Sequence, residues 1–100
     1  MMTPEAREKK KVKTYLDSIG AFHRWPVPRG MGQPDIDCHA CIAGQFWGIE
    51  VKVPGEEPTT LQDRTLGQMQ KAGAATVWGT AEVVIRGIMT WRKQLHLGLV

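Results

Sequence analysis

The sequence predicts an α/β (or α+β) sandwich, a central sheet flanked by helices in the order α-β-β-β-α-β-α. Three observations predict it. Apolar residues recur at helical spacing near both ends of the chain, short strand-like runs fill the middle, and glycine-containing breaks separate the segments. The chain has 100 residues, 42% of them hydrophobic, so we expect a single domain over residues 1–100 with its own core.

The first helix is expected to begin at Pro4. Thr3 before Pro4 is the order typical of a helix N-terminus, with a hydroxyl cap followed by a proline in the first turn. Gly20 is a typical residue after a helix end. The apolar stripe of this helix consists of Val12, Tyr15, Leu16 and Ile19.

Three strands are expected next, over residues 22–27, 36–42 and 46–53. Ala43-Gly44 forms a tight turn between the second and third of them. A second helix is expected from a cap at Thr60 to about residue 72, then a short strand over 75–78. The last helix is capped by Thr80, and its core-facing residues are Val84, Ile85, Ile88 and Leu95.

Composition narrows the classes of function. The net charge of +3 and the pI of about 9.1 favour a polyanionic partner such as nucleic acid. No apolar run is long enough for a membrane-spanning helix, and the basic N-terminus lacks the apolar run of a signal peptide. Only two cysteines occur, which cannot form a disulfide framework. We therefore expect a cytoplasmic protein with no membrane partner.

Acidic residues stand in the two central strands, where a core would be expected. With a two-residue turn, residue 42 pairs with 45, and side chains alternate between the faces of a strand. This register places Asp37 opposite Glu50 and Asp35 opposite Lys52, all on one surface.

Two opposed carboxylates repel each other, and a divalent cation removes the conflict. Mg²⁺ held there would polarise a phosphodiester and activate a water, while Lys52 could orient or deprotonate that water or neutralise the phosphate. The structural alternative is a solvated polar face in which Asp35 and Lys52 form a surface ion pair of little energetic value.

Two further features favour the site. Glu5 and Glu8 project into the apolar stripe of the first helix, so each needs a partner there: the helix N-terminus, a cation or a second lysine. Gln62 lies on the inward side of the second helix, although a local hydrogen bond at the helix start would explain it equally well.

Together these segments resemble a known family. The motifs "TPEAREKKKVKTYL", "GMGQPDIDCHAC" and "GQFWGIEVKVPGEEPTTLQ" resemble the stand-alone VRR-NUC nucleases of bacteriophages, within the PD-(D/E)xK superfamily. The resemblance spans about residues 3–84. It implies a restriction-endonuclease-like αβββαβ core with a mixed sheet, here followed by a C-terminal helix. The same domain forms the catalytic end of the Fanconi-associated nuclease.

The family implies cleavage of DNA phosphodiesters with Mg²⁺, or Mn²⁺ as a substitute. The small phage forms are similar to Holliday-junction resolvases, which act on four-way junctions as homodimers, so branched DNA and a second copy are the implied partners. By position, the catalytic set matched in this sequence is Glu5, Asp37, Glu50, Lys52 and Gln62. Within it, the implied metal ligands are Glu5, Asp37, Glu50 and the backbone carbonyl of Val51; Glu8 is the alternative to Glu5.

Two aspartates, Asp35 and Asp37, are candidates for the metal ligand. The superfamily name points to Pro34-Asp35, whereas the phage pattern has its aspartate 13 positions before the glutamate, which is the spacing from Asp37 to Glu50. The hairpin register also places Asp37 opposite Glu50. We therefore predict Asp37 as the ligand and Asp35 as an accessory acid.

Basic residues crowd the first helix and recur beyond it. A solvated helix face is the common meaning of such a run, but beside a phosphodiesterase site it predicts contacts to the DNA backbone. The expected DNA-binding residues are Lys9, Lys10, Lys11, Lys13, Arg24, Arg29 and Arg64.

Symmetric cutting of a junction needs two sites, so the family function implies a homodimer. The last helix is the candidate interface, although core packing explains part of its apolar character. Its apolar candidates are Ile85, Ile88, Met89, Trp91 and the tail "LHLGLV".

Two other hypotheses of function stay open. A non-catalytic basic DNA-binding module could keep the same fold. A thiol or zinc site at Cys38 and Cys41 is disfavoured, because the pair is half a zinc motif and the two side chains point to opposite faces of a strand; both are expected to act as small buried hydrophobes.

Overall fold

The computed structural model describes residues 1–27 and 36–99. They form one four-stranded sheet in the order β1-β2-β3-β4, with three helices. The element order and the α/β class predicted from the sequence are confirmed. The elements are α1 (Pro4–Ser18), β1 (Phe22–Arg24), β2 (Cys38–Ile42), β3 (Gln45–Val51), α2 (Thr60–Lys71), β4 (Ala75–Gly79) and α3 (Ala81–His96).

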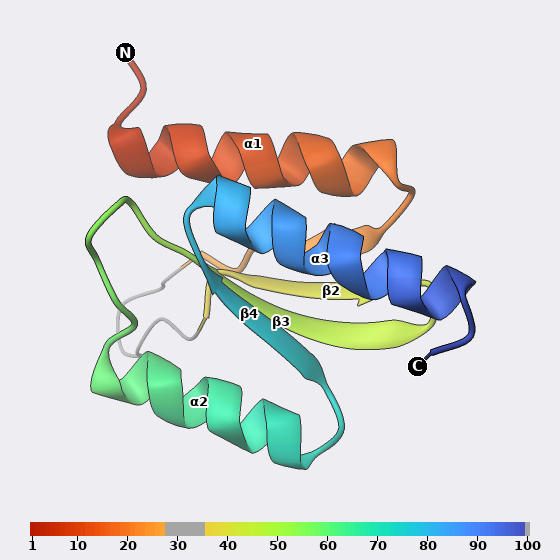
Figure 1. Ribbon diagram of the computed structural model, residues 1–100. Coiled ribbons are helices and arrows are strands. Elements are labelled where there is room, and N and C mark those ends of the chain that lie inside the picture. The colour runs from red at the N-terminus through yellow and green to blue at the C-terminus, as the bar shows by residue number, and fades with distance from the viewer. Residues whose placement is uncertain (28–35, 100) are drawn as a thin grey trace.

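The helices form layers on both faces of the sheet. Figure 1 shows α1 and α3 side by side on one face and α2 on the other. Strands β1, β2 and β3 run antiparallel, whereas β4 pairs with β3 in parallel. Parallel neighbours require a crossover, and α2 provides it. The result is a mixed sheet, as the sequence motifs imply.

The β2–β3 turn fixes which residues face each other. Ala43 and Gly44 both have positive φ, 49° and 83°, as expected in a two-residue turn that matches the twist of the hairpin. Ile42 therefore pairs with Gln45, and the ladder continues to Cys38 opposite Ile49. The predicted pairing of residue 42 with 45 is confirmed, whereas Asp35, predicted opposite Lys52, lies outside the described residues.

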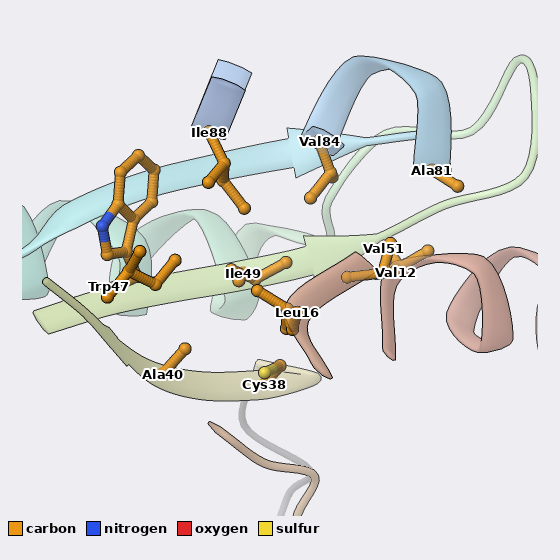
Figure 2. Packing of buried hydrophobic residues seen from close by; sticks show 11 residues of the cluster. Val12, Leu16, Cys38, Ala40, Trp47, Ile49, Val51, Ala81, Val84 and Ile88 are labelled. Atoms are coloured by element: carbon orange, nitrogen blue, oxygen red, sulfur yellow. The ribbon is translucent and has the colours of Figure 1, made fainter. Parts of the chain in front are cut away.

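The core lies between the sheet and the α1–α3 layer. Figure 2 shows Leu16 of α1 and Ile88 of α3 directed toward Ile49 of β3, and all three are fully buried. Trp91 of α3 packs edge-on against Trp47, with ring centroids 5.5 Å apart. Ile88 and Trp91 therefore pack in or against the core. This agrees with the expectation that core packing explains part of the apolar character of the last helix.

Several predicted boundaries are wrong by one to three residues. β1 ends at Arg24 rather than 27, β2 begins at Cys38 rather than 36, and β3 ends at Val51 rather than 53. The cap of α2 is Thr59 and not Thr60, because Thr59 has the extended backbone of a capping residue and its hydroxyl accepts a hydrogen bond from Gln62 N. These three strands therefore end or begin inside the sequence segments that predicted them.

Gly48 lets α2 approach the sheet closely. A β-carbon at this position would lie 2.7 Å from the Met69 side chain of α2 and 2.9 Å from that of Ile36. Any larger residue would push the helix or these side chains away. The missing side chain thus sets the spacing between β3 and α2.

Glu8 joins α1 to the beginning of α3. Its carboxylate accepts a hydrogen bond from the backbone N–H of Ala81, 3.0 Å away, at the positive end of the α3 dipole. This hydrogen bond lowers the pKa of Glu8, against the opposing effect of burial.

Within the described residues, no helix is both long and apolar enough to span a membrane.

Replacing Glu8 with glutamine tests this link. The amide can still accept from Ala81, so the variant removes mainly the charge, and we expect a loss of about 1 kcal/mol in the free energy of unfolding at neutral pH. Because the pKa of Glu8 is lowered by folding, the charge contribution is complete above the usual value of 4.5 and is lost as the pH falls through the lowered one. Urea unfolding at neutral and at acidic pH measures both.

Glu56→Gln is the matched control, because Glu56 is exposed in the loop before α2. A Glu8→Gln deficit that persists unchanged in acid would contradict the electrostatic account.

Candidate active site

The candidate site lies where β2 and β3 separate, one residue before β2 begins. The backbone N–H of Asp37 donates to Glu50 Oε1 at 2.9 Å, and the N–H of Val51 donates to Asp37 Oδ2 at 2.8 Å. Side chains thus continue the hydrogen bonding between the two strands beyond the backbone ladder. They hold the carboxylates of Asp37 and Glu50 next to each other.

The Val51 carbonyl faces the same space. Lys52 N donates to Gly79 O, so that N–H points toward β4. A trans peptide directs its C=O opposite to its N–H, and the described residues contain no cis peptide bond. The carbonyl of Val51 therefore points away from β4, toward the side where Asp37 lies.

Among the described residues, Glu50 is the one charged residue that is buried, with 2% of its surface exposed. Burial raises its pKa, and the charge of Asp37 raises it further. Oε2 receives a hydrogen bond from Gln62 Nε2 at 2.8 Å and lies 3.3 Å from Lys52 Nζ. The protein thus holds a carboxylate where its ionised form is disfavoured, with the amide and the ammonium group as compensation.

Gln62 reaches Glu50 because α2 begins beside the site. Its backbone N–H donates to Thr59 Oγ1, and its side-chain oxygen accepts from Thr59 N, which together form a capping box. The remaining amide N–H₂ is free to donate to Glu50. Both expectations for Gln62, a local hydrogen bond at the helix start and an inward role, therefore hold together.

Lys9 of α1 lies between two carboxylates, that of Glu5 on the same helix and that of Asp37 directly before β2. Its Nζ is 3.3 Å from Asp37 Oδ1 and 3.5 Å from Glu5 Oε1. Burial disfavours the charged ammonium, but the carboxylates of Asp37 and Glu5 outweigh it and raise the pKa of Lys9. Glu5 itself is 61% exposed, and it approaches Asp37 only through Lys9.

Glu8 is not part of this cluster, because its carboxylate is bound to Ala81 and Lys11. Asp35, the predicted accessory acid, and Arg29 lie outside the described residues. Among the residues that are described, no three His, Cys, Asp or Glu side chains gather closely enough to hold a metal ion.

The donors present are nevertheless those that a hard cation prefers. They are carboxylate oxygens of Asp37 and Glu50 and the carbonyl of Val51, and Mg²⁺ is commonly held by one or two carboxylates together with water. Burial, and after it the charge of Asp37, raises the pKa of Glu50, and a nearby cation would favour its ionised form. The residues thus fit a magnesium or manganese ion.

Basic residues border the site on the α1 side. Lys9 and Lys13 line a hollow of about 250 Å³ with Asp37 and Trp25, and Lys13 Nζ lies 4.9 Å from the centre of the Trp25 ring. The other predicted DNA-binding residues in the described part are all exposed: Lys11, which pairs with Glu8, and Lys10, Arg24 and Arg64.

The cysteines have separate environments. Cys38 is buried in the core, and burial raises the pKa of its thiol to about 12. Cys41 is exposed on the other face of β2, so the expectation that both cysteines are buried is wrong for Cys41. The expected divergence of the two side chains is present.

Sequence reasoning missed two neighbours of the carboxylates. Lys9 was expected only to bind DNA, although its position four residues after Glu5 places both on one helical face. Trp78 of β4 is paired in register with Glu50 and is 41% exposed. The pairing of β4 with β3 could not be read from the sequence, since it depends on the crossover.

Gln62→Ala tests how much the buried carboxylate depends on its amide partner. The variant removes half of the capping box and leaves Glu50 Oε2 without a hydrogen-bond donor other than Lys52. We expect a loss of about 1–3 kcal/mol in the free energy of unfolding. Gln68→Ala, at an exposed position of the same helix, is the control and should change it by less than about 0.5 kcal/mol. Equal effects would contradict the arrangement.

Comparison with known proteins supports the fold. A solved structure described as a VRR_NUC domain superposes on this chain with a TM-score of 0.74, covering 89% of this chain and 97% of its own, at 21% sequence identity. No family model matches the sequence. No curated protein matches it either. At this identity the likeness establishes the fold: the chain has the restriction-endonuclease-like fold of a VRR_NUC domain.

Proposed function

We propose that this chain is a divalent-metal-dependent endonuclease that hydrolyses phosphodiester bonds in DNA. The observation that carries the proposal is the reciprocal pairing of Asp37 with Glu50 and Val51, which gathers two carboxylates and a carbonyl beside Lys52. The fold shared with a VRR_NUC domain supports it.

Each side chain of the site has a role in such a reaction. Asp37, Glu50 and the Val51 carbonyl would hold Mg²⁺ or Mn²⁺, and Gln62 fixes the orientation of Glu50. When bound, the ion would polarise the phosphodiester and lower the pKa of a water molecule. With its Nζ only 3.3 Å from Glu50, Lys52 is placed to orient that water or to neutralise charge on the phosphate.

Lys9 adds a second positive charge from the α1 side. Its contact with Asp37 offsets the repulsion between the two carboxylates while no cation is bound. A bound cation would take over that role and would leave the ammonium group of Lys9 available to a DNA phosphate in the hollow that it lines with Lys13. Glu5 is exposed and next to Lys9, and it would become a ligand only if Lys9 moved aside.

The substrate that we propose is branched DNA, with four-way junctions as the leading candidate. The basic residues of α1 supply contacts to phosphates, which position DNA without reading sequence. Arg24 and Arg64 extend this set to β1 and α2. Recognition of DNA shape therefore suits this surface better than recognition of bases in a groove.

Paired cuts across a junction need two sites, so we propose a homodimer that uses the outer face of α3. Met89 is 53% exposed and lines a hollow there together with Ile85. Leu97 and Leu99 extend the apolar surface beyond the helix end, at 63% and 69% exposure. Ile88 and Trp91 do not contribute to it, because they pack in the core.

Cleavage of labelled four-way junction, flap and duplex substrates tests the activity. We expect cutting with Mg²⁺ or Mn²⁺, a preference for the junction, and none in EDTA. Asp37→Asn should abolish cleavage because it removes the charge of a ligand. Asp35→Asn should reduce it by about 10- to 100-fold, the usual effect of a residue that supports ligands.

Asp63→Asn, an exposed acid in the first turn of α2, is the control and should cut normally. DNA binding without cleavage under every metal condition would instead support a non-catalytic DNA-binding module. Full activity of Asp37→Asn would refute the ligand assignment.

The dimer is tested by light scattering across a range of protein concentrations. Met89→Glu places an unpaired charge in the proposed interface, which costs about 3–5 kcal/mol. The dissociation constant of the dimer should therefore rise by at least about 100-fold. Leu61→Glu, on α2, should leave the mass unchanged. A wild-type protein that stays monomeric at all concentrations would exclude this interface.

A further inference from the structure

One face of the sheet is only partly covered. α2 packs against β3 and β4, and within the described chain it does not reach β1 or β2. Among the described helices, none covers the side chains of β1, β2 and early β3 on this face. Phe22 is 59% exposed and Phe46 is 48% exposed, and the thiol residue between them, Cys41, is exposed as well.

Strand register places these three residues in one row. Phe22 is paired with Cys41, and Cys41 with Phe46. Register partners lie on the same face of a sheet, about 5 Å from strand to strand. The two rings thus stand on either side of a small side chain, with their outer surfaces available to a flat ligand.

A second row brings nitrogen-rich groups to the same rings. Arg24 and His39 are register partners on this face. The guanidinium carbon of Arg24 lies 4.2 Å from the centre of the Phe22 ring, and the His39 ring centre lies 6.0 Å from that of Phe46. None of the five side chains is acidic. We call Phe22, Arg24, His39, Cys41 and Phe46 the aromatic face.

Glu50 of the candidate active site lies on the same side of the sheet as the aromatic face. Gly48 and Glu50 follow Phe46 at every second position of β3, and His39 and Cys41 alternate in the same way along β2, which begins one residue after Asp37. At about 3.4 Å per residue, Cys41 lies on the order of 14 Å from Asp37. Ile36 and Met69 meet over Gly48 between the two regions, so the face is a surface of its own beside the site.

We propose that the aromatic face binds unpaired bases of the DNA substrate by stacking, with Arg24 contacting the phosphate backbone. Aromatic residues on an open sheet bind single-stranded nucleic acid in this way, because every base has a flat π-face. The five residues include the cationic Arg24 and no acidic side chain, which suits a polyanion. The proposal rests on the proposed function, since branched DNA exposes unpaired bases where its arms meet.

Binding measured without cleavage tests the proposal. Fluorescence anisotropy of a labelled oligothymidylate and of a duplex of equal length, both in EDTA, gives the two dissociation constants. Phe22→Ala and Phe46→Ala should each weaken single-strand binding by about 5- to 150-fold and leave duplex binding within about twofold. Phe46→Trp should retain it, because the larger ring still stacks.

Val83→Ala is the matched control, since Val83 is 50% exposed but lies on α3, across the sheet. It should bind both probes as the wild type does. Circular dichroism of each variant confirms that the fold is kept, and exposed positions make folding defects small.

The outcomes separate this proposal from the nuclease activity. Phenylalanine-dependent single-strand binding with no cleavage in any metal would refute the nuclease and leave the aromatic face intact. Normal cleavage with single-strand binding unaffected by either phenylalanine would overturn the aromatic face alone. Equal weakening for single strand and duplex would overturn it as well. So would a loss of self-association in the phenylalanine variants with DNA binding unchanged, because the face would then join two copies of the chain.

Discussion

The geometry of the site depends on two hydrogen bonds that cross from Asp37 to β3. Where β2 and β3 separate, the backbone ladder ends, and an unpaired N–H of β3 would face the gap. Asp37 satisfies the N–H of Val51 with its carboxylate and gives its own N–H to Glu50. The two hydrogen bonds that extend the pairing of β2 with β3 also bring two negative charges together. The stability of the hairpin and the chemistry of the site therefore depend on the same atoms.

This arrangement is electrostatically unfavourable until something offsets it. Glu50 is buried and next to Asp37, and its raised pKa expresses both facts. Gln62 of α2, Lys52 directly after β3 and Lys9 of α1 each offset part of this cost. Perturbed carboxylates with compensating groups are typical of functional sites, because a merely structural core would use apolar residues at these positions.

Much of this could be predicted from local sequence rules. The turn at Ala43-Gly44 fixed the register, and the register together with the spacing of 13 residues placed Asp37 beside Glu50. The partners from other layers could not be predicted in the same way. Lys9 and Glu8 are adjacent in α1 yet serve different neighbours, Asp37 and Ala81, because the rotation of the helix against the sheet and α3 decides which side chain meets which. Periodicity identifies the inward face of a helix but not what it will meet.

The hydrogen bond between Glu8 and Ala81 links the charge balance of the site to the position of α1. It joins residues 73 positions apart, which only the folded chain brings together. Lys9 is adjacent to Glu8 in α1, and its ammonium group lies 3.3 Å from Asp37. The helix position that satisfies the first N–H of α3 is therefore also the one that offsets the repulsion between the two carboxylates.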